Sequence, residues 1–148
     1  MKFRFRFQTV LDHRQRLLEE AQEDYAKEKR KLDDQLAVIQ NLYSSIDQTR
    51  QRASLIQTEG GTIAGALGSY EDFIQGTKVK IETEKHKVRE MMTIVEQKMQ
   101  VMIERQADVK AMEKLREKGL EEFKKMQRQK EQKEIDDIIV VRHNRKLL

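Results

Sequence analysis

Apolar residues recur at every seventh position in two long stretches of the chain. The first column is Leu11, Leu18, Tyr25, Leu32, Ile39, Ile46 and Ala53. The second column is Ile74, Ile81, Val88, Val95, Met102 and Val109. A spacing of seven is typical of α-helices that pair along a narrow apolar seam. The pattern therefore predicts two long helices, one over about residues 5–57 and one over about residues 69–142.

Glycine separates the two stretches. Four of the six glycines lie in the short segment between them, at Gly60, Gly61, Gly65 and Gly68. Glycine inside a helix costs roughly 1 kcal/mol relative to alanine, so this cluster favours a break. Ser69, with an acidic residue three positions later, fits the start of a helix. We therefore expect a glycine-rich tip over residues 58–68, with residues 1–148 forming one rod.

A short connection between two long helices implies that they pair antiparallel. With a tip centred near Ile63, residue i should face roughly residue 127 minus i. Leu11 would then oppose Arg116, and Phe7 would lie beside Leu120 and Phe123. The second helix has no partner beyond about Met126. The predicted fold class is all-α: an antiparallel two-helix coiled-coil hairpin with a C-terminal helical overhang.

The overhang has an unusual apolar segment. Residues 127–134 are wholly polar, and the aliphatic residues Ile135, Ile138, Ile139, Val140 and Val141 follow. An exposed apolar patch on an unpaired helix usually marks an interaction site. The alternative is that this segment frays or packs on the N-terminal phenylalanines Phe3, Phe5 and Phe7. Those phenylalanines could themselves cap the open end of the hairpin or dock a partner.

The composition fits a rod better than a globule. Charged residues make up 38% of the chain and aromatic residues only 5%, so a thick core is not expected. The remaining apolar residues suffice for a narrow seam between two helices. The net charge of +4 is mild. There is no cysteine, no apolar run of 18 residues and no secretory signal pattern. We expect a cytoplasmic protein without a membrane span.

No pattern in the sequence indicates catalysis. His13, His86 and His143 lie far apart without metal-ligand spacing, and the glycine-rich segment lacks the lysine of a phosphate-binding loop. A two-helix hairpin also offers no enclosed pocket for acid–base chemistry. We expect no enzymatic activity, no cofactor and no metal. Acidic residues interrupt the basic cluster around Lys124 and no aromatic is interleaved, so nucleic-acid binding is not expected either.

Three segments of the chain carry a combination of residues typical of one known family. Residues 3–14 read Phe-Arg-Phe-Arg-Phe-Gln-Thr-Val-Leu-Asp-His-Arg, followed by Glu-Glu-Ala at 19–21. Residues 70–75 read Tyr-Glu-Asp-Phe-Ile-Gln, and residues 131–137 read Glu-Gln-Lys-Glu-Ile-Asp-Asp. In this order along the whole chain, the three segments resemble the FliJ family, the small coiled-coil proteins of the bacterial flagellar type III export apparatus.

The resemblance implies a function. Members of this family are central stalks of the export ATPase: they insert into its hexameric ring, promote its assembly and activity, and link it to the cytoplasmic domain of the membrane export gate. They also help to recycle export chaperones. The implied location is the cytoplasmic face of the inner membrane, at the flagellar basal body.

The resemblance also implies two sets of binding residues. The ATPase-facing set is Gln132, Lys133, Asp136, Asp137, Arg142, Phe3, Phe5 and Phe7. The gate-facing set, early in the second helix, is Phe73, Thr77, Lys80 and Glu84.

Three other readings of the same sequence remain open. One is the equivalent stalk of a virulence-type secretion system. Another is a generic coiled-coil chaperone or scaffold without an ATPase partner. The third is a parallel dimer or a nucleic-acid binder.

Overall fold

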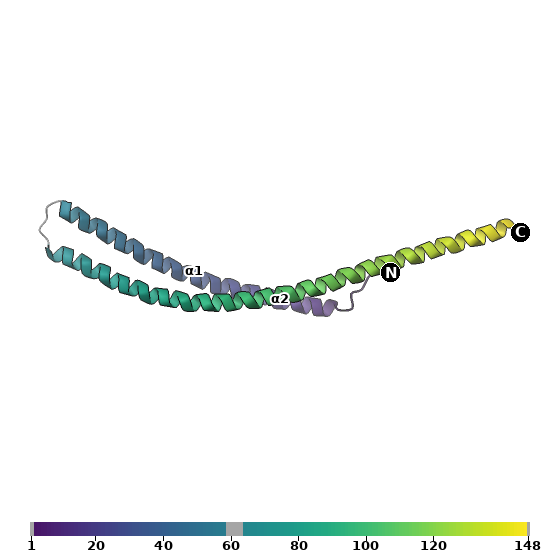
Figure 1. The fold of residues 1–148 in the computed structure, drawn as a ribbon, viewed down its shortest axis with the longest axis horizontal. Helices are drawn as coiled ribbons and strands as arrows, with labels where there is room; N and C mark the ends of the chain where they lie inside the picture. The colour runs from purple at the N-terminus through teal and green to yellow at the C-terminus, as the bar shows by residue number, and fades with distance from the viewer. Residues whose placement is uncertain (1, 59–63, 148) are drawn as a thin grey trace. The chain divides into compact units, whose positions relative to one another are not determined.

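The computed structural model describes residues 2–58 and 64–147, and within these ranges it contains two α-helices and no strand. Helix α1 spans Gln8–Thr58 and has 51 residues, whereas α2 spans Ala64–Leu147 and has 84. The helices run antiparallel, and α2 continues beyond the start of α1 (Figure 1). The all-α helical hairpin predicted from the spacing of the apolar residues is confirmed.

The first helix starts later than the expected residue 5. The backbone N–H of Gln8 donates to the carbonyl of Phe5 at 3.2 Å, which closes a turn just before the helix. The N–H of Leu11 then donates to the carbonyl of Phe7 at 3.0 Å. Residues 2–5 form no regular secondary structure, so this segment leaves the helix axis. We call residues 2–7 the N-terminal strap.

The second helix starts earlier than the expected residue 69. It begins at Ala64, so Gly65, Gly68 and Ser69 lie inside it and Ser69 is not its N-cap. A side chain at either glycine would meet nothing within 4 Å, so this part of the helix is open and packing does not require glycine there. The penalty of roughly 1 kcal/mol per glycine was too small to exclude helix. Gly60 and Gly61 of the expected tip lie outside the described residues.

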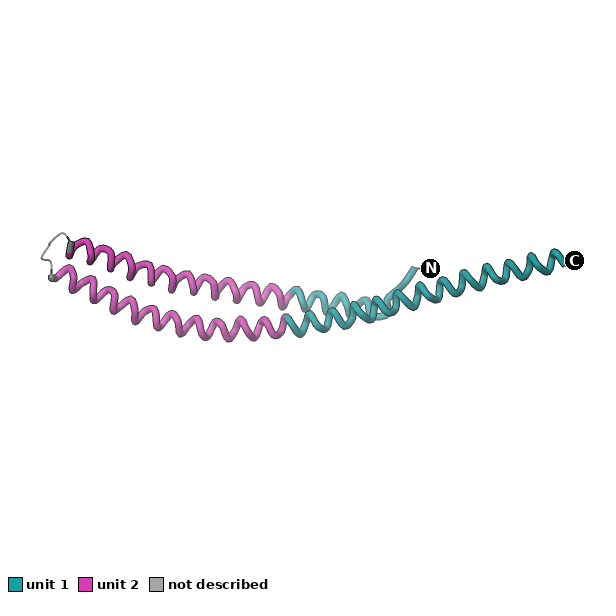
Figure 2. Tube along the Cα trace, turned by 45° about the horizontal axis from the view of Figure 1, so that its top comes forward, with its two compact units in different colours: residues 1–19, 103–148 teal, residues 20–102 magenta. Residues whose placement is uncertain are grey.

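The chain divides into two compact units, each described here by itself (Figure 2). Unit 1 comprises Met1–Glu19 and Ile103–Leu148, and unit 2 comprises Glu20–Met102. Each unit contains a segment of α1 and a segment of α2.

Unit 2 is a paired hairpin with one continuous apolar seam. Its buried residues come from the two columns of sevenfold spacing, and Leu42, Met91 and Val95 pack against them. The buried set is Leu32, Ile39, Ile46, Ile74, Ile81 and Val88. Ile46 and Ile81 are the most deeply buried, with 3% of each residue exposed. Burial of this kind contributes roughly 1.5–3 kcal/mol per large aliphatic side chain, which holds the two helices together.

Polar side chains also enter the seam of unit 2. Thr49, Thr77 and Glu84 are buried there. The hydroxyls of Thr49 and Thr77 donate to carbonyls one turn earlier in their own helices, at 2.8 and 2.7 Å. The side-chain amide of Gln35 reaches across from α1 and donates to both the carboxylate and the carbonyl of Glu84. In the described part of the chain, no buried side-chain nitrogen or oxygen lacks a partner.

Unit 1 has a smaller core. Leu11, Val109 and Met112 are buried together, with Phe5 and Leu18 packed against them. The guanidinium of Arg14 donates to the carbonyl of Asp108 at 3.1 Å, which ties α1 to α2 beside this core.

The pairing register differs from the expected one. Leu11 was predicted to face Arg116, but it packs on Val109 and Met112. Gln35 would have faced Met92 by the same rule, yet it bonds to Glu84. The expected tip was centred too late in the chain, because α2 already begins at Ala64. Both contacts of α1 therefore lie about one to two turns earlier in α2 than predicted.

Candidate partner-binding surfaces

The N-terminal strap lies against α2 in unit 1. The ring of Phe3 stacks at a tilt on the ring of Phe123, with 5.6 Å between their centroids. The same ring lies above Gly119, where a Cβ atom would come within 3.3 Å of it. Gly119 therefore provides space for Phe3, and this close approach accounts for a glycine in the middle of α2. Met126, one turn beyond Phe123, is already 68% exposed.

The three strap phenylalanines differ in exposure. Phe3 and Phe5 are half-buried, on Phe123 and on the unit 1 core respectively. Phe7 is 42% exposed, and it contacts the ring of Phe5 edge-on with 5.9 Å between centroids. The guanidinium of Arg6 lies over the Phe7 ring at 5.5 Å. The strap therefore closes the paired part of unit 1, and Phe7 is its most accessible aromatic.

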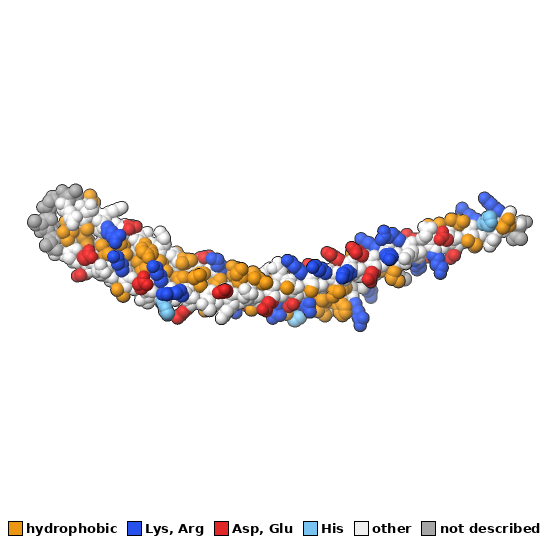
Figure 3. Space-filling view, in the orientation of Figure 1, with side chains coloured by type: hydrophobic (Ala, Val, Ile, Leu, Met, Phe, Trp, Pro, Cys, Tyr) orange, Lys and Arg blue, Asp and Glu red, His pale blue; other side chains and the backbone are white. Residues whose placement is uncertain are grey.

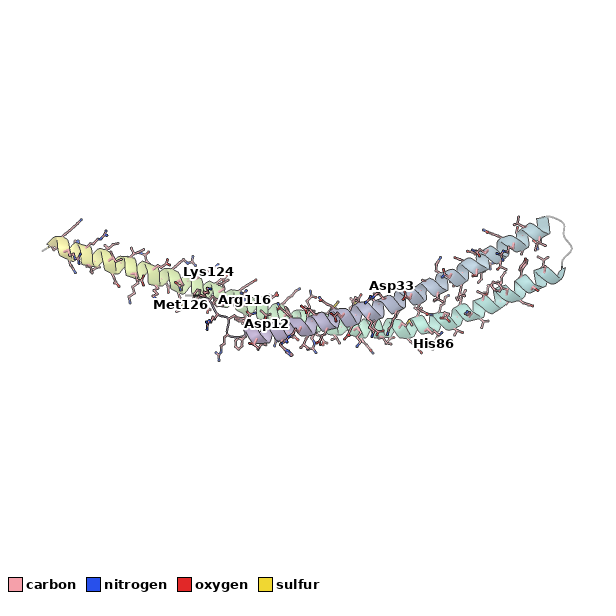
Figure 4. The ribbon with its side chains drawn as sticks, turned by 180° about the vertical axis from the view of Figure 1, so that it is seen from behind. Asp12, Asp33, His86, Arg116, Lys124 and Met126 are labelled. Atoms are coloured by element: carbon pink, nitrogen blue, oxygen red, sulfur yellow. The ribbon has the colours of Figure 1, made fainter. Side chains whose placement is uncertain are left out.

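Beyond the strap, α2 continues without a partner helix. Every residue from 128 to 147 is exposed, whereas α2 residues nearer the strap include buried ones such as Met112. Figure 4 labels Lys124 and Met126, which lie on α2 where this continuation begins. We call residues 124–147 the free helix.

The free helix carries charge in blocks. Residues 123–130 contain four basic residues and no acidic one, and residues 142–146 contain three basic residues and no acidic one. Between these blocks, Glu131, Glu134, Asp136 and Asp137 make the segment acidic. Blue side chains and orange apolar ones alternate along this part of α2 in Figure 3.

The residues of the free helix that the family resemblance implies for ATPase binding all lie on its surface. Gln132, Lys133, Asp136, Asp137 and Arg142 are exposed. The amide of Gln132 donates to the carboxylate of Asp136 at 3.1 Å, one turn further along the same helix. These polar side chains therefore surround an apolar segment on the same helix.

That apolar segment consists of the five aliphatic residues predicted from the sequence to be exposed. Their exposed fractions lie between 51% and 57%. They are Ile135, Ile138, Ile139, Val140 and Val141, and we call them the aliphatic belt. None of them packs on the N-terminal phenylalanines, which contact α2 at Gly119, Phe123 and the unit 1 core instead.

The gate-facing residues implied by the family resemblance lie in unit 2, and the structure splits them into two pairs. Phe73 is 49% exposed and Lys80 is exposed. Thr77 and Glu84 are buried in the seam against α1. Their side chains therefore stabilise the hairpin itself and do not form an outer stripe with Phe73 and Lys80.

The sequence contained a signal for this burial. Thr77 and Glu84 follow the column residues Ile74 and Ile81 by three positions, and Met91 follows Val88 in the same way. A residue three after each column position completes the seam of a coiled coil. The polar character of Thr77 and Glu84 concealed this regularity, and Gln35, which follows Leu32 by three, holds the corresponding seam position in α1.

The pKa of Glu84, whose side chain lies in the seam, is lower than that of an ordinary glutamate. The hydrogen bond from Gln35 lowers its pKa first of all, and a hydrogen bond from Lys87 lowers the pKa further. The ammonium of Lys87 lies 3.3 Å from the carboxylate, one turn along α2. Glu84 therefore stays ionised in the seam at neutral pH.

Within residues 2–58 and 64–147, no group of three His, Asp or Glu side chains could hold a metal ion. His86 lies 3.4 Å from Glu90 on the exposed surface of α2. Across the same residues, neither helix has a stretch long and apolar enough to cross a membrane.

The fold and these surfaces define a two-helix coiled-coil protein with an exposed C-terminal helix. The model of one family, the flagellar FliJ protein, matches residues 2–148, and the chain belongs to this family. It is thus a coiled-coil protein related to flagellar export, from a family of non-catalytic components. Comparisons with curated proteins and with solved structures find no match.

Proposed function

We propose that this protein is the central stalk of the flagellar type III export ATPase. In this role it would enter the ATPase ring with the free helix, promote ring assembly and hydrolysis, and couple the ring to the export gate. The observation that carries the proposal is the free helix, which is exposed on all sides and bears an apolar segment that no part of the described chain covers. Membership of the FliJ family supports the same role.

The ATPase contact is assigned to unit 1. Gln132, Lys133, Asp136, Asp137 and Arg142 are exposed around the aliphatic belt, where a surrounding partner can reach them. Phe7 is the accessible aromatic of the strap. Phe3 and Phe5 would act indirectly, since they hold the strap on α2.

The gate contact is assigned to unit 2. Phe73 and Lys80 are the two exposed members of the implied set and would touch the cytoplasmic domain of the gate. Thr77 and Glu84 would support them by fixing the hairpin. Export chaperones would be the third class of partner, and the protein would work in the cytoplasm at the base of the flagellum.

The direct test mixes the purified protein with its cognate export ATPase and measures ATP hydrolysis and ring formation. We expect both to increase, and no effect on either would overturn the proposal. A variant lacking residues 124–148 should keep its helical hairpin and lose ATPase binding, because the paired segments of both units remain. A scaffold that binds partners along its paired helices would instead keep them after this deletion.

A further inference from the structure

The exposure of side chains alternates along the N-terminal strap. Phe3 and Phe5 are half-buried, on Phe123 and on the unit 1 core. The cationic side chains of Lys2, Arg4 and Arg6 are exposed. Alternate side chains of an extended chain point to opposite faces, so this order indicates an extended segment with its cations on the outer face. Figure 2 draws this segment beside α2, up to the N-terminus.

The backbone of the strap forms few hydrogen bonds. In the described chain, the carbonyl of Phe5 accepts from Gln8 and the carbonyl of Phe7 accepts from Leu11, both where the strap meets α1. The peptide groups of residues 2–4 pair with no other peptide group among the described residues. An extended segment whose N–H and C=O groups are unpaired is a template for the addition of another strand.

The outer cations of the strap have no acidic partners within the described chain. No carboxylate there lies within ion-pair distance of Lys2, Arg4 or Arg6. The guanidinium of Arg6 lies over the Phe7 ring instead. The α2 turns that begin at Phe123 add to the charge, since residues 123–130 contain four basic residues and no acidic one. The strap and these turns therefore favour an anionic partner.

Three other occupants fit the strap poorly. The strap of a second copy would set cations opposite cations across the strand pair, which is destabilising. A membrane surface or a single-stranded nucleic acid would use exposed aromatic rings, for insertion or for base stacking. Phe3 and Phe5 are instead packed on α2 and on the unit 1 core.

We infer that the strap is a docking edge for an acidic, extended segment of a partner protein, which adds to it as a β-strand. Carboxylates at every second position of that segment would lie opposite Lys2, Arg4 and Arg6. The residues between them would point toward α2, so the partner segment alternates acidic with apolar residues. The peptide hydrogen bonds supply affinity and the cations supply selectivity. This docking edge goes beyond the proposed stalk function and does not depend on it.

The packing of the strap prepares it for this pairing. Phe3 lies above Gly119 and against Phe123, which holds the segment on α2 before a partner arrives. Ordering a flexible terminus on binding costs affinity, so a segment that is already held extended binds more tightly. Gly119 and Phe123 are therefore positioning residues for the docking edge.

The test uses the full-length chain and a short fluorescent peptide that alternates glutamate with valine. Binding is followed by fluorescence anisotropy, and amide exchange in residues 2–5 is measured with and without the peptide. A second peptide has the same side chains but a methyl group on every backbone nitrogen, which removes its peptide hydrogen-bond donors. The variant Arg4→Gln is compared with Arg145→Gln, which removes the same charge from an exposed position of the free helix.

We expect the first peptide to bind and to slow amide exchange in residues 2–5 severalfold. Arg4→Gln should weaken binding about two- to fivefold, the effect of one cross-strand charge pair, and Arg145→Gln should bind like the unaltered chain. Phe3→Ala should weaken binding about fivefold, because the strap is no longer held on α2.

Four results would overturn the docking edge. Equal binding of the methylated peptide would show charge attraction without strand pairing. Equal losses in Arg4→Gln and Arg145→Gln would show that the strap is not the site. Tighter binding of a single-stranded oligothymidine than of the peptide would assign the cationic surface to nucleic acid. Absence of peptide binding would also overturn it, and the stalk function would still stand or fall by its own test with the ATPase.

Discussion

The seam of unit 2 and the aliphatic belt use the same residue types with opposite results. In unit 2, leucine, isoleucine and valine recur at every seventh position of both helices, so the two columns bury each other along one seam. In the belt, five such residues fall within seven positions and all remain exposed. Spacing, more than hydrophobicity, therefore decides whether the apolar residues of a segment are buried between α1 and α2.

The polar residues of the two regions differ in the same way. Gln35, Thr77 and Glu84 lie inside the seam of unit 2 and are bonded there. Gln132 and Asp136 lie on the free helix and bond only to each other within one turn. A polar residue at a seam position contributes to the pairing of the helices, whereas a polar residue on the free helix stays available to a partner.

The largest expected difference comes from shortening one isoleucine in each region. Ile81→Ala should destabilise the hairpin by about 2–4 kcal/mol, because a residue that is 3% exposed leaves a cavity in the seam. Ile139→Ala should change the stability by less than about 0.5 kcal/mol, because Ile139 is 57% exposed. Urea unfolding followed by circular dichroism measures both. Equal losses would mean that the belt is buried in the free protein.

The second prediction concerns the contact between the N-terminal strap and α2. Gly119→Val should displace the Phe3 ring from α2, because even a Cβ atom at position 119 would lie 3.3 Å from this ring. Amide exchange in residues 2–7 should then accelerate severalfold, and stability should fall by about 1–2 kcal/mol as the Phe3–Phe123 contact is lost. Gly76→Val is the matched control, since nothing lies within 4 Å of a side chain there. A strap that exchanges equally slowly in both variants would contradict this contact.

The buried carboxylate of unit 2 should make that region sensitive to acid. Its pKa in the folded protein is lowered, mainly by Gln35, so ionised Glu84 stabilises the hairpin above the ordinary pKa of roughly 4.3. This contribution is lost as the pH falls through the lowered pKa. Glu84→Gln should therefore unfold with a flatter pH dependence below about pH 4.3.

The control for this acid effect lies in the free helix. Glu134→Gln should leave the pH dependence of hairpin unfolding unchanged, because Glu134 is exposed outside the paired segments. If Glu84→Gln and the unaltered chain lose stability in parallel on acidification, the Gln35–Glu84 hydrogen bond does not cause the acid sensitivity of the hairpin.

The smallest effect is expected at the start of α2. Gly68→Ala should stabilise the protein by about 0.4–1 kcal/mol, because Gly68 lies inside the helix and a methyl group meets nothing within 4 Å. Thermal unfolding measures the shift. A destabilised Gly68→Ala variant would indicate that this turn needs glycine and that the helix begins nearer the expected residue 69.

Much of the fold could be predicted from local patterns. The two columns of sevenfold spacing identified the hydrophobic core cluster of unit 2, from Leu32 to Val88. The boundaries were less predictable, because a glycine penalty of roughly 1 kcal/mol is small enough for a helix to include Gly65 and Gly68. That error in the start of α2 moved the whole predicted register, so Leu11 was matched with Arg116 in place of Val109 and Met112.

The candidate surfaces were predicted unevenly. The aliphatic belt was identified correctly as exposed, since no apolar column in the chain remained to cover it. The family resemblance implied a gate-facing set of Phe73, Thr77, Lys80 and Glu84, and the structure buries Thr77 and Glu84. The pairing of α1 with α2 decides which members of this set remain exposed.

The periodicity of apolar residues in the sequence was enough to predict the two helices, the short connection was enough to predict their antiparallel pairing, and the absence of a further apolar column was enough to predict the exposed belt. The pairing register, the hydrogen bond from Gln35 to Glu84 and the packing of Phe3 over Gly119 came only from the tertiary structure. These three features depend on which residues from distant parts of the chain meet. That choice is made by packing and hydrogen bonding between the helices, which no local pattern contains.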